Sequence, residues 1–555
     1  MPQVSASVLV VGAGPVGLSL AIELARHGVR PTVIDMALEP SPFCRAIGVS
    51  PRTLEIFEAM GVAREIIGAG LRISGRRAVI HRGADVIVHD EMIDLSDLPY
   101  AQYGVPQNRT EAVLQDKLRS FGIEPERGCR LAALTENAEG VTVELERQGQ
   151  VARRRYDWVV GCDGAHSAVR KALGVVFEGE AFPFEFMLGD VAIDWDLPRG
   201  MTLQAIWPAT DAPPDFFVAI PLPARGRYRV SMMAPLQPGG ESAGDVAHGI
   251  QSDRPGATLE QLQAVADRLL PGRPLLSEMR WSSIFRISMR LAERYRVGHV
   301  FLAGDACHIH PPTGGQGMNT GIQDAANLAW KLALVCRGLA PAALLDSYEA
   351  ERRPVAAAVI EDTVRRSVGL GKPAEPPHRL HDTQLLVSYA GGPLAPGQAD
   401  GGPAPGDRMP DMQGLRKVGI GFPLRLFDLT GGPGFTLLAF PKAGEFAELE
   451  ALAARLATSW PGCFATVAIL PAGQAWDDPP GIAVVEDVGD AVNGLFAGAP
   501  PALLLLRPDG YVAFRGAMSA EPLLGYLQAM IGLQPPVTDR RSRRGSAGNA
   551  SRSAD

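Results

Sequence analysis

The chain has 555 residues, a hydrophobic content of 46% and a formal net charge of −8 at pH 7. This size allows several domains around a large core, and the acidic balance excludes the basic surface of a nucleic-acid-binding protein. Because we find no long apolar run and no basic leader, we expect a cytoplasmic protein without membrane spans.

The first segment has the pattern of a dinucleotide-binding βαβ unit. A strand over residues 7–11 leads into Gly12-x-Gly14-x-x-Gly17, a helix follows, and a second strand ends at Asp35. Gly12 permits the tight turn, Gly14 lets the backbone approach a pyrophosphate, and Gly17 allows the helix to pack on the sheet. Asp35 can accept hydrogen bonds from ribose hydroxyls. The pattern predicts nucleotide binding, and a plain glycine turn is the alternative.

Three polar residues follow at the ends of predicted elements. Arg45 lies in a loop before a helix that starts near Pro51, Gln107 precedes a helix over residues 110–121, and Asp163 follows an apolar strand ending at Gly161. An arginine just past the second strand can reach a pyrophosphate. Taken alone, however, Arg45 is typical of a solvated loop and Asp163 of a helix cap.

Residues 180–290 lack the βαβ rhythm and are rich in aromatic residues and methionine. Runs such as 216–220 and 228–233 predict strands. We expect an antiparallel sheet lining a mostly apolar pocket, with a contribution from residues 72–105.

A second strand–loop–helix unit begins near residue 298. The apolar run 300–303 ends at Gly304-Asp305, a Pro/Gly-rich loop follows, and helical periodicity starts at Met318. The first turn of such a helix has unpaired N–H groups and the positive end of the helix dipole. This segment therefore predicts a site for an electron-rich group. Residues 345–372 also have a helical pattern.

The C-terminal third is separated by a Pro/Gly-rich linker, assigned to residues 396–412. Residues 413–533 predict a further α/β unit, and residues 534–555 predict a disordered tail. The six cysteines are far apart and form no CxxC pair. We therefore expect reduced thiols and neither a disulfide framework nor a metal site.

Together, Gly12–Gly17, Asp163-Gly164 and the run from Gly304 to Asn319 resemble the single-component flavin-dependent aromatic hydroxylases, such as p-hydroxybenzoate hydroxylase and phenol hydroxylase. The resemblance covers about residues 5–395. The chain length and the third domain resemble those of the longer members, such as phenol hydroxylase and 3-(3-hydroxyphenyl)propionate hydroxylase, and aromatic polyketide hydroxylases share the same plan. It implies an α/β fold with a Rossmann-like FAD-binding domain (1–179 and 291–395), an antiparallel-sheet substrate domain (180–290) and a thioredoxin-like C-terminal domain without CxxC (413–533).

The resemblance also implies a role for each matching residue. Gly12, Gly14, Pro15 and Gly17 would face the FAD pyrophosphate with Arg45, Asp35 would bind the adenosine ribose, and Gln107 would lie near the ribityl chain. Asp163 matches a motif associated with FAD and the nicotinamide nucleotide. Gly304 and Asp305 would bind the ribityl hydroxyls, Pro312 would lie beside the flavin and the substrate, and Gly317, Met318 and Asn319 would present donors to the flavin C2 carbonyl.

Two positions depart from the family pattern. The ribose-binding acid is followed by Met36, where the family often has a basic residue, and Gln316 stands where p-hydroxybenzoate hydroxylase has a lysine. Both departures remove positive charge from the predicted cofactor site. The second also argues against a small benzoate as the substrate.

The implied activity is hydroxylation of a phenolic compound by FAD, NAD(P)H (NADPH favoured) and O2 through a flavin C4a-hydroperoxide. We also expect that two copies of the chain can form a homodimer. His308 and His310 are candidates for the base that deprotonates the phenol, although a loop histidine beside proline is more often structural. The alternatives are a tailoring oxygenase that hydroxylates or inserts oxygen into an aromatic polyketide, and a non-catalytic flavin-binding protein.

Overall fold

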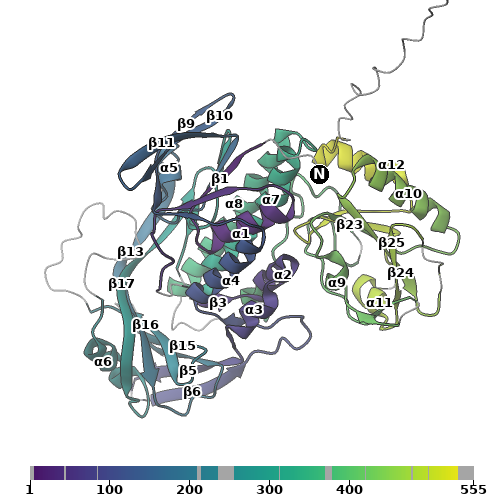
Figure 1. Cartoon of the computed structure of the whole chain (residues 1–555). Helices are drawn as coiled ribbons and strands as arrows, with labels where there is room; N and C mark the ends of the chain where they lie inside the picture. The colour runs from purple at the N-terminus through teal and green to yellow at the C-terminus, as the bar shows by residue number, and fades with distance from the viewer. Residues whose placement is uncertain are drawn as a thin grey trace, which may run out of the picture.

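The computed structural model describes residues 6–42, 46–83, 85–208, 214–235, 256–311, 313–368, 378–399, 401–418, 421–474, 476, 479–497 and 499–534. The predicted site residues Arg45 and Pro312, and the predicted tail beyond residue 534, lie outside these ranges. Figure 1 shows a first α/β part, a second sheet at its lower end and a C-terminal α/β unit at its side. Among the described residues, no helix has the length and apolar character needed to cross a bilayer.

The first part is built on a sheet in the order β18-β19-β12-β1-β2-β8. All neighbouring pairs are parallel except β18 and β19. Its central strands are short, buried apolar runs, as a sheet covered on both faces requires. The strands are β1 (Val8–Val11), β2 (Thr32–Asp35), β8 (Glu126–Arg127), β12 (Trp158–Gly161), β18 (Arg296–Val297) and β19 (Val300–Leu302).

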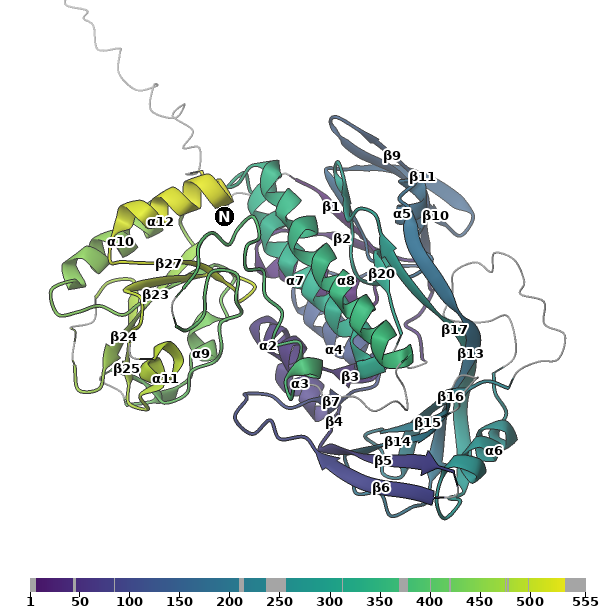
Figure 2. The ribbon, with the colours of Figure 1, turned by 180° about the vertical axis from the view of Figure 1, so that it is seen from behind.

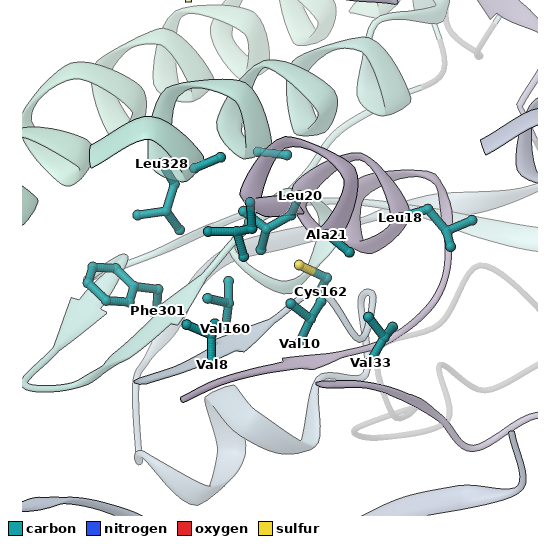
Figure 3. Packing of buried hydrophobic residues seen from close by; sticks show 14 of the residues in the cluster. Val8, Val10, Leu18, Leu20, Ala21, Val33, Val160, Cys162, Phe301 and Leu328 are labelled. Carbon is teal, nitrogen blue, oxygen red and sulfur yellow. The ribbon is translucent and has the colours of Figure 1, made fainter. Parts of the chain in front are cut away.

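Helix α1 (Pro15–Arg26) lies between this sheet and α7 (Gly317–Cys336). Figure 3 shows Leu18, Leu20 and Ala21 of α1 above strand residues such as Val10. The other face of the sheet is covered by a small meander of β9, β10 and β11, which contributes to the same core. The meander consists of β9 (Cys129–Asn137), β10 (Gly140–Arg147) and β11 (Gln150–Tyr156). The other helices of the first part are α2 (Pro51–Met60), α3 (Ala63–Gly68), α4 (Gln107–Ser120), α5 (Ala168–Ala172) and α8 (Asp346–Val368).

The second part is a sheet in the order β20-β17-β13-β16-β15-β14-β5-β6. Its pairs are antiparallel except β5 with β14, which are parallel. β5 comes from the first part of the chain, before the strands of the first sheet that precede β13 are complete. Helix α6 (Leu259–Leu269) packs on one face, at the outer margin of the molecule in Figures 1 and 2. The strands are β5 (Gly75–Arg82), β6 (Asp85–Met92), β13 (Phe177–Ile193), β14 (Met201–Trp207), β15 (Asp215–Pro221), β16 (Arg227–Met233), β17 (Leu276–Ala292) and β20 (His308–Ile309).

The two parts are continuous through β13 and β17. The predicted limits at 179/180 and 290/291 fall inside these two strands. A small sheet in the order β3-β7-β4 also joins the parts, and its strands are β3 (Gly48–Val49), β4 (Leu71–Arg72) and β7 (Tyr103–Gly104). Because β13 and β17 run across the limits predicted between the FAD-binding and substrate domains, those domain limits stay a prediction.

The C-terminal unit has a sheet in the order β22-β21-β25-β24-β23-β26-β27. The strands are β21 (Leu415–Lys417), β22 (Pro423–Leu424), β23 (Phe435–Ala439), β24 (Phe464–Pro471), β25 (Ile482–Asp487), β26 (Leu503–Leu506) and β27 (Val512–Gly516), and the helices are α9 (Phe427–Thr430), α10 (Phe446–Ser459), α11 (Ala491–Phe496) and α12 (Ala520–Tyr526). The preceding linker packs against this unit, because the Gly406 N–H donates to Val512 O and the Met409 N–H to Gly510 O.

Candidate cofactor site

The glycine loop between β1 and α1 leaves open space in front of the helix. A Cβ atom at Gly12 would lie 2.4 Å from the Cys162 carbonyl oxygen, and one at Gly17 would lie 1.9 Å from the Gly12 oxygen. At Gly14, by contrast, a Cβ would meet no atom within 4 Å. Two glycines are thus needed for packing, and the third opens the N-terminus of α1, with Pro15 at its start, to a ligand. Unpaired N–H groups and the helix dipole make this place suitable for a pyrophosphate.

Asp35 lies at the end of β2, beside this loop. Its carboxylate accepts hydrogen bonds from the Ala13 N–H (2.7 Å) and the Ala37 N–H (2.8 Å). The Nη1 atom of Arg127, from β8, is 3.5 Å from the Asp35 Oδ2 atom. The expectation that this acid lacks a neighbouring cation is therefore wrong, because a strand distant in sequence supplies one where Met36 does not.

The second strand–loop–helix unit meets the first at Gly304. A Cβ at Gly304 would lie 2.8 Å from the Val16 side chain in the first turn of α1, and one at Gly321 would lie 3.0 Å from the Gly304 Cα atom. Gly304 adopts a φ of +63°, which favours glycine. The half-buried Asp305 follows in a 3₁₀ turn (Gly304–Ala306). The structure thus brings the segments around Gly14 and Asp305 together, although about half of the chain separates them.

The start of α7 is fixed by the Asn319 side chain, which is buried. Its amide makes four hydrogen bonds, accepting from Ser50 N (3.0 Å) and Thr53 Oγ1 (2.7 Å) and donating to Gly48 O (2.9 Å) and Gly315 O (2.7 Å). This side chain therefore has no capacity left for a ligand. The donors that the first turn can offer are its backbone N–H groups, at Gly317, Met318 and Asn319.

Gln107 and Asp163 are held by neighbouring backbone. Gln107 Oε1 accepts from the Ala46 N–H (3.0 Å), which fixes the segment directly after Arg45. The Asp163 carboxylate accepts from Ser167 Oγ (2.6 Å) and from the Ala168 N–H (2.7 Å) at the start of α5. Burial raises the pKa of Asp163. Its side chain thus acts as a helix cap, on the loop whose Cys162 carbonyl touches the glycine turn.

Gln316, the second departure from the family pattern, is buried. Its Nε2 atom is 3.5 Å from Asp382 Oδ1, and Asp382 already pairs with Arg366 at 2.6 Å. The glycine loop therefore has a cation nearby, but an acid neutralises it.

The two candidate histidines differ in their environment. His308 Nε2 lies 2.7 Å from Asp324 Oδ2 and both side chains are fully buried. His310 Nδ1 lies 2.8 Å from Pro311 O, so this nitrogen must donate and the buried Nε2 atom is an acceptor. Burial lowers the pKa of His310 to about 4. His310 is therefore uncharged at neutral pH.

A buried polar network behind the site was not predicted from the sequence. Asp324 of α7 accepts from the Gly304 N–H (3.1 Å) and pairs with Arg352 of α8 (2.7 Å). Burial alone would raise the pKa of Asp324, but Arg352 and His308 outweigh it and lower that pKa. Cys307, His308 and Asp324 have the donor atoms for a metal ion, yet the Asp324 charge is already balanced by Arg352. The sequence feature that could have indicated this network is the run of polar residues within the otherwise apolar helix α7.

Comparison with known proteins decides the family. A model of the FAD binding domain family matches residues 5–363, and a model of the HcaD C-terminal domain matches residues 423–530. The chain belongs to the family of FAD-dependent aromatic monooxygenases. This confirms the resemblance and the assignment as an enzyme.

Two curated relatives match nearly the whole monooxygenase. The 6-methylpretetramide 4-monooxygenase of Streptomyces rimosus is 34% identical over 94% of this chain and 93% of its own. The pentachlorophenol 4-monooxygenase of Sphingobium chlorophenolicum is 32% identical over 94% and 95%. Among solved structures, the OxyS anhydrotetracycline hydroxylase from Streptomyces rimosus has a TM-score of 0.71 at 30% identity, covering 95% of this chain and 99% of that chain. A ternary complex of aklavinone-11 hydroxylase with FAD and aklavinone has a TM-score of 0.73 at 26% identity, covering 96% and 100%.

In the monooxygenase, the face of the second sheet opposite α6 carries a row of large apolar side chains. Phe186 is the register partner of both Phe285 and Met233, and its ring centroid is 5.8 Å from that of Phe285 and from that of Phe216. Side chains alternate along a strand, so their neighbours Met187 and Phe217 face α6 instead. We call Phe186, Phe216, Met233 and Phe285 the aromatic wall. It crosses four adjacent strands, β17-β13-β16-β15.

The aromatic wall is connected to the candidate cofactor site through β17. In β17, Arg290 pairs with Ile309 and Leu291 with His308, the residues just before the glycine loop of the second unit. The wall and the cofactor site therefore share a continuous strand.

Proposed function

We propose that this monooxygenase binds FAD across the glycine loop, Asp35 and the start of α7, and uses NAD(P)H and O2 to hydroxylate a phenolic substrate. The close packing of Gly304 and Gly321 against Val16 carries this proposal, since it brings the first turns of α1 and α7 near each other, as binding of one elongated ligand by both would require. When bound, FAD accepts a hydride from NAD(P)H and activates O2. NADPH is the favoured donor.

The residues have separate tasks in this proposal. The turn formed by Gly12, Gly14, Pro15 and Gly17 receives the pyrophosphate at its open point, Gly14. Asp35 with Arg127 binds the ribose, and Gln107, Gly304 and Asp305 bind the ribityl region. The N–H groups of Gly317, Met318 and Asn319 stabilise negative charge on the ring, because a helix N-terminus is equivalent to about half a positive charge. Asp163 shapes the adjoining loop. The family resemblance assigns Arg45 to the pyrophosphate and Pro312 to the place between flavin and substrate, and we propose the same roles here.

The test is the visible spectrum of the purified protein, followed by NADPH oxidation with phenols. We expect a yellow protein, or FAD uptake by a colourless one, and substrate-dependent NADPH oxidation with a hydroxylated product. A protein that does not bind added FAD would contradict the proposal. FAD binding without NAD(P)H oxidation on any aromatic would instead favour a non-catalytic flavin-binding protein.

Asp305→Ala should weaken FAD binding about 10- to 150-fold, because hydrogen bonds to a charged group contribute about 1.5–3 kcal/mol. Fluorescence titration of the apoprotein measures this. Asp196→Ala is the matched control, since that side chain is exposed in the second part. An unchanged FAD affinity for Asp305→Ala would remove Asp305 from the site.

The aromatic wall favours a multi-ring substrate, such as an aromatic polyketide, over a single phenol. Four strands spaced about 4.8 Å apart give a wall about 14 Å across, which is longer than one ring requires. The Arg229 guanidinium on the same face is bound to Asp190 and lies 4.8 Å from the Trp281 ring centroid. The wall therefore suits a neutral, extended aromatic compound better than a carboxylate.

Phe216→Ala shortens this wall at one end. It should raise KM about 2- to 10-fold for a multi-ring phenol, since an aromatic pair contributes about 0.5–1.5 kcal/mol. The KM of a single-ring phenol should stay the same. Steady-state NADPH oxidation with both substrates distinguishes these outcomes, and an equal change in both KM values would contradict the multi-ring assignment.

We also propose that the C-terminal unit is thioredoxin-like. The parallel β23–α10–β24 unit and the antiparallel β26–β27 pair, in the sheet order β24-β23-β26-β27, support this. Cys463 has no neighbouring cysteine in sequence, so this unit would not carry out dithiol chemistry.

A further inference from the structure

The turn between β26 and β27 inserts a charged side chain into the first part of the molecule. Arg507 is 2% exposed, and its guanidinium donates to Glu351 Oε1 (2.7 Å) and Oε2 (2.9 Å) on α8. On its other edge it donates to Asp509 Oδ1 (2.9 Å). Asp509 in turn accepts from Trp330 Nε1 of α7 (3.1 Å). The C-terminal unit therefore contacts both long helices behind the cofactor site through one arginine and one aspartate.

Glu351 transmits this contact to α7. Its Oε2 atom also accepts from Lys331 Nζ (2.7 Å) and from Asn327 Nδ2 (2.7 Å). Both partners belong to α7, one turn apart. The Arg507 guanidinium lies over the rings of Trp330 and Tyr389, with its carbon 5.2 Å and 5.1 Å from the two centroids. The hydrogen bonds of Glu351 thus hold α7 against α8 at the level where the Arg507 side chain packs between the two helices and the C-terminal unit.

The adjacent residue continues the network to the cofactor loop. Arg352 donates to Asp324 Oδ1 (2.7 Å), to the carbonyl oxygen of Thr320, the fourth residue of α7 (3.0 Å), and to Tyr389 Oη (3.0 Å). Asp324 then accepts from the Gly304 N–H and from His308. A continuous path therefore leads from the C-terminal turn to both sides of the predicted flavin site, with its cations Lys331, Arg352 and Arg507 matched by the buried carboxylates Asp324, Glu351 and Asp509.

We infer that the C-terminal unit supports the cofactor site, and that Arg507 is a positioning residue that fixes the start of α7 relative to Gly304. The inference rests on the proposed function, because it assumes that this junction holds FAD. The apolar core agrees with it, since Trp330 and Leu334 of α7 belong to the same cluster as Leu503 and Leu505 of β26. The C-terminal unit and α7 therefore share one apolar core.

The test is FAD affinity in Arg507→Met, which approximately keeps the length of the side chain but removes the charge and the hydrogen bonds to Glu351 and Asp509. We expect a folded protein that binds FAD about tenfold more weakly, with a changed visible circular dichroism spectrum of the bound flavin. Arg507→Lys should restore part of the affinity, because it returns one charged donor to Glu351. Arg416→Met is the matched control, since Arg416 pairs with Glu486 on the same unit and is 44% exposed.

A second measurement on the unaltered protein guards against a variant that does not fold. Coupling between two sites is reciprocal, so FAD binding should slow amide hydrogen exchange in the turn 507–510 as well as at the start of α7. Unchanged exchange in that turn, or an Arg507→Met protein that binds FAD within twofold of the wild type with the same flavin spectrum, would overturn the inference alone. A wild-type protein that does not bind FAD would overturn the proposed function as well.

Discussion

Gly14→Glu should abolish FAD binding and leave the fold intact. The open space at Gly14 accepts the new side chain, because a Cβ there meets no atom within 4 Å. Its carboxylate would then occupy the N-terminus of α1, where the pyrophosphate is proposed to lie, and would repel it. We expect a loss of affinity of at least about 100-fold, equivalent to about 3 kcal/mol, measured by titrating the apoprotein with FAD.

Gly444→Glu is the control for this substitution. Gly444 is exposed in the C-terminal unit, and a Cβ there also meets no atom within 4 Å. It adds the same charge at a distance from the site, so FAD affinity should not change. If Gly14→Glu bound FAD as well as this control did, the pyrophosphate would have to lie elsewhere.

Glu351→Gln should destabilise the protein strongly and remove part of its acid sensitivity. Burial alone would raise the pKa of Glu351, but Arg507 and Lys331 outweigh it and lower that pKa from 4.5 to about 2. A carboxyl group whose pKa is lower in the folded state stabilises that state above its unfolded pKa. The contribution, about 3 kcal/mol, is lost as the pH falls from about 4.5 toward 2.

The glutamine variant leaves the Lys331 and Arg507 charges under-compensated in a buried place. Breaking a buried ion pair costs about 3–5 kcal/mol, so urea unfolding at pH 7 should show a loss of this size. The difference between variant and wild type should shrink as the pH falls below about 4.5. Glu361→Gln, on the exposed side of the same helix, should behave like the wild type at every pH. A variant difference that stays constant down to pH 2 would contradict the charge assigned to Glu351.

The features predicted correctly from sequence are those whose physical cause is local. The tight turn at Gly12, the helix that follows the glycine motif and the strand that ends at Asp35 lie within thirty residues, so their spacing alone indicates the unit. The structure starts this helix at Pro15, inside the motif. The strand before Gly304 and the helix after the loop are equally local; β19 covers Val300–Leu302 of the predicted run 300–303, and α7 begins one residue before the predicted Met318.

The features that could not be predicted depend on contacts between distant segments. Arg127 reaches Asp35 only because β8 pairs with β2 in the folded sheet. Arg507 and Glu351 are 156 residues apart, and no periodicity in either segment indicates that they meet. At Asp163 the local sequence pattern itself is ambiguous. A helix-capping aspartate and a ligand-binding aspartate have the same pattern, and they differ only in what the carboxylate contacts.

The sheet order β18-β19-β12-β1-β2-β8 also constrains how the protein is made. β19 lies next to β12, although about 140 residues separate them, and α7 follows β19. While the ribosome is still synthesising the second sheet, the emerging chain has the glycine loop but neither Gly304 nor the helix that completes the junction. If FAD binds at the proposed junction, it can therefore be loaded only late in translation or after release, when the segments from both parts of the chain are available.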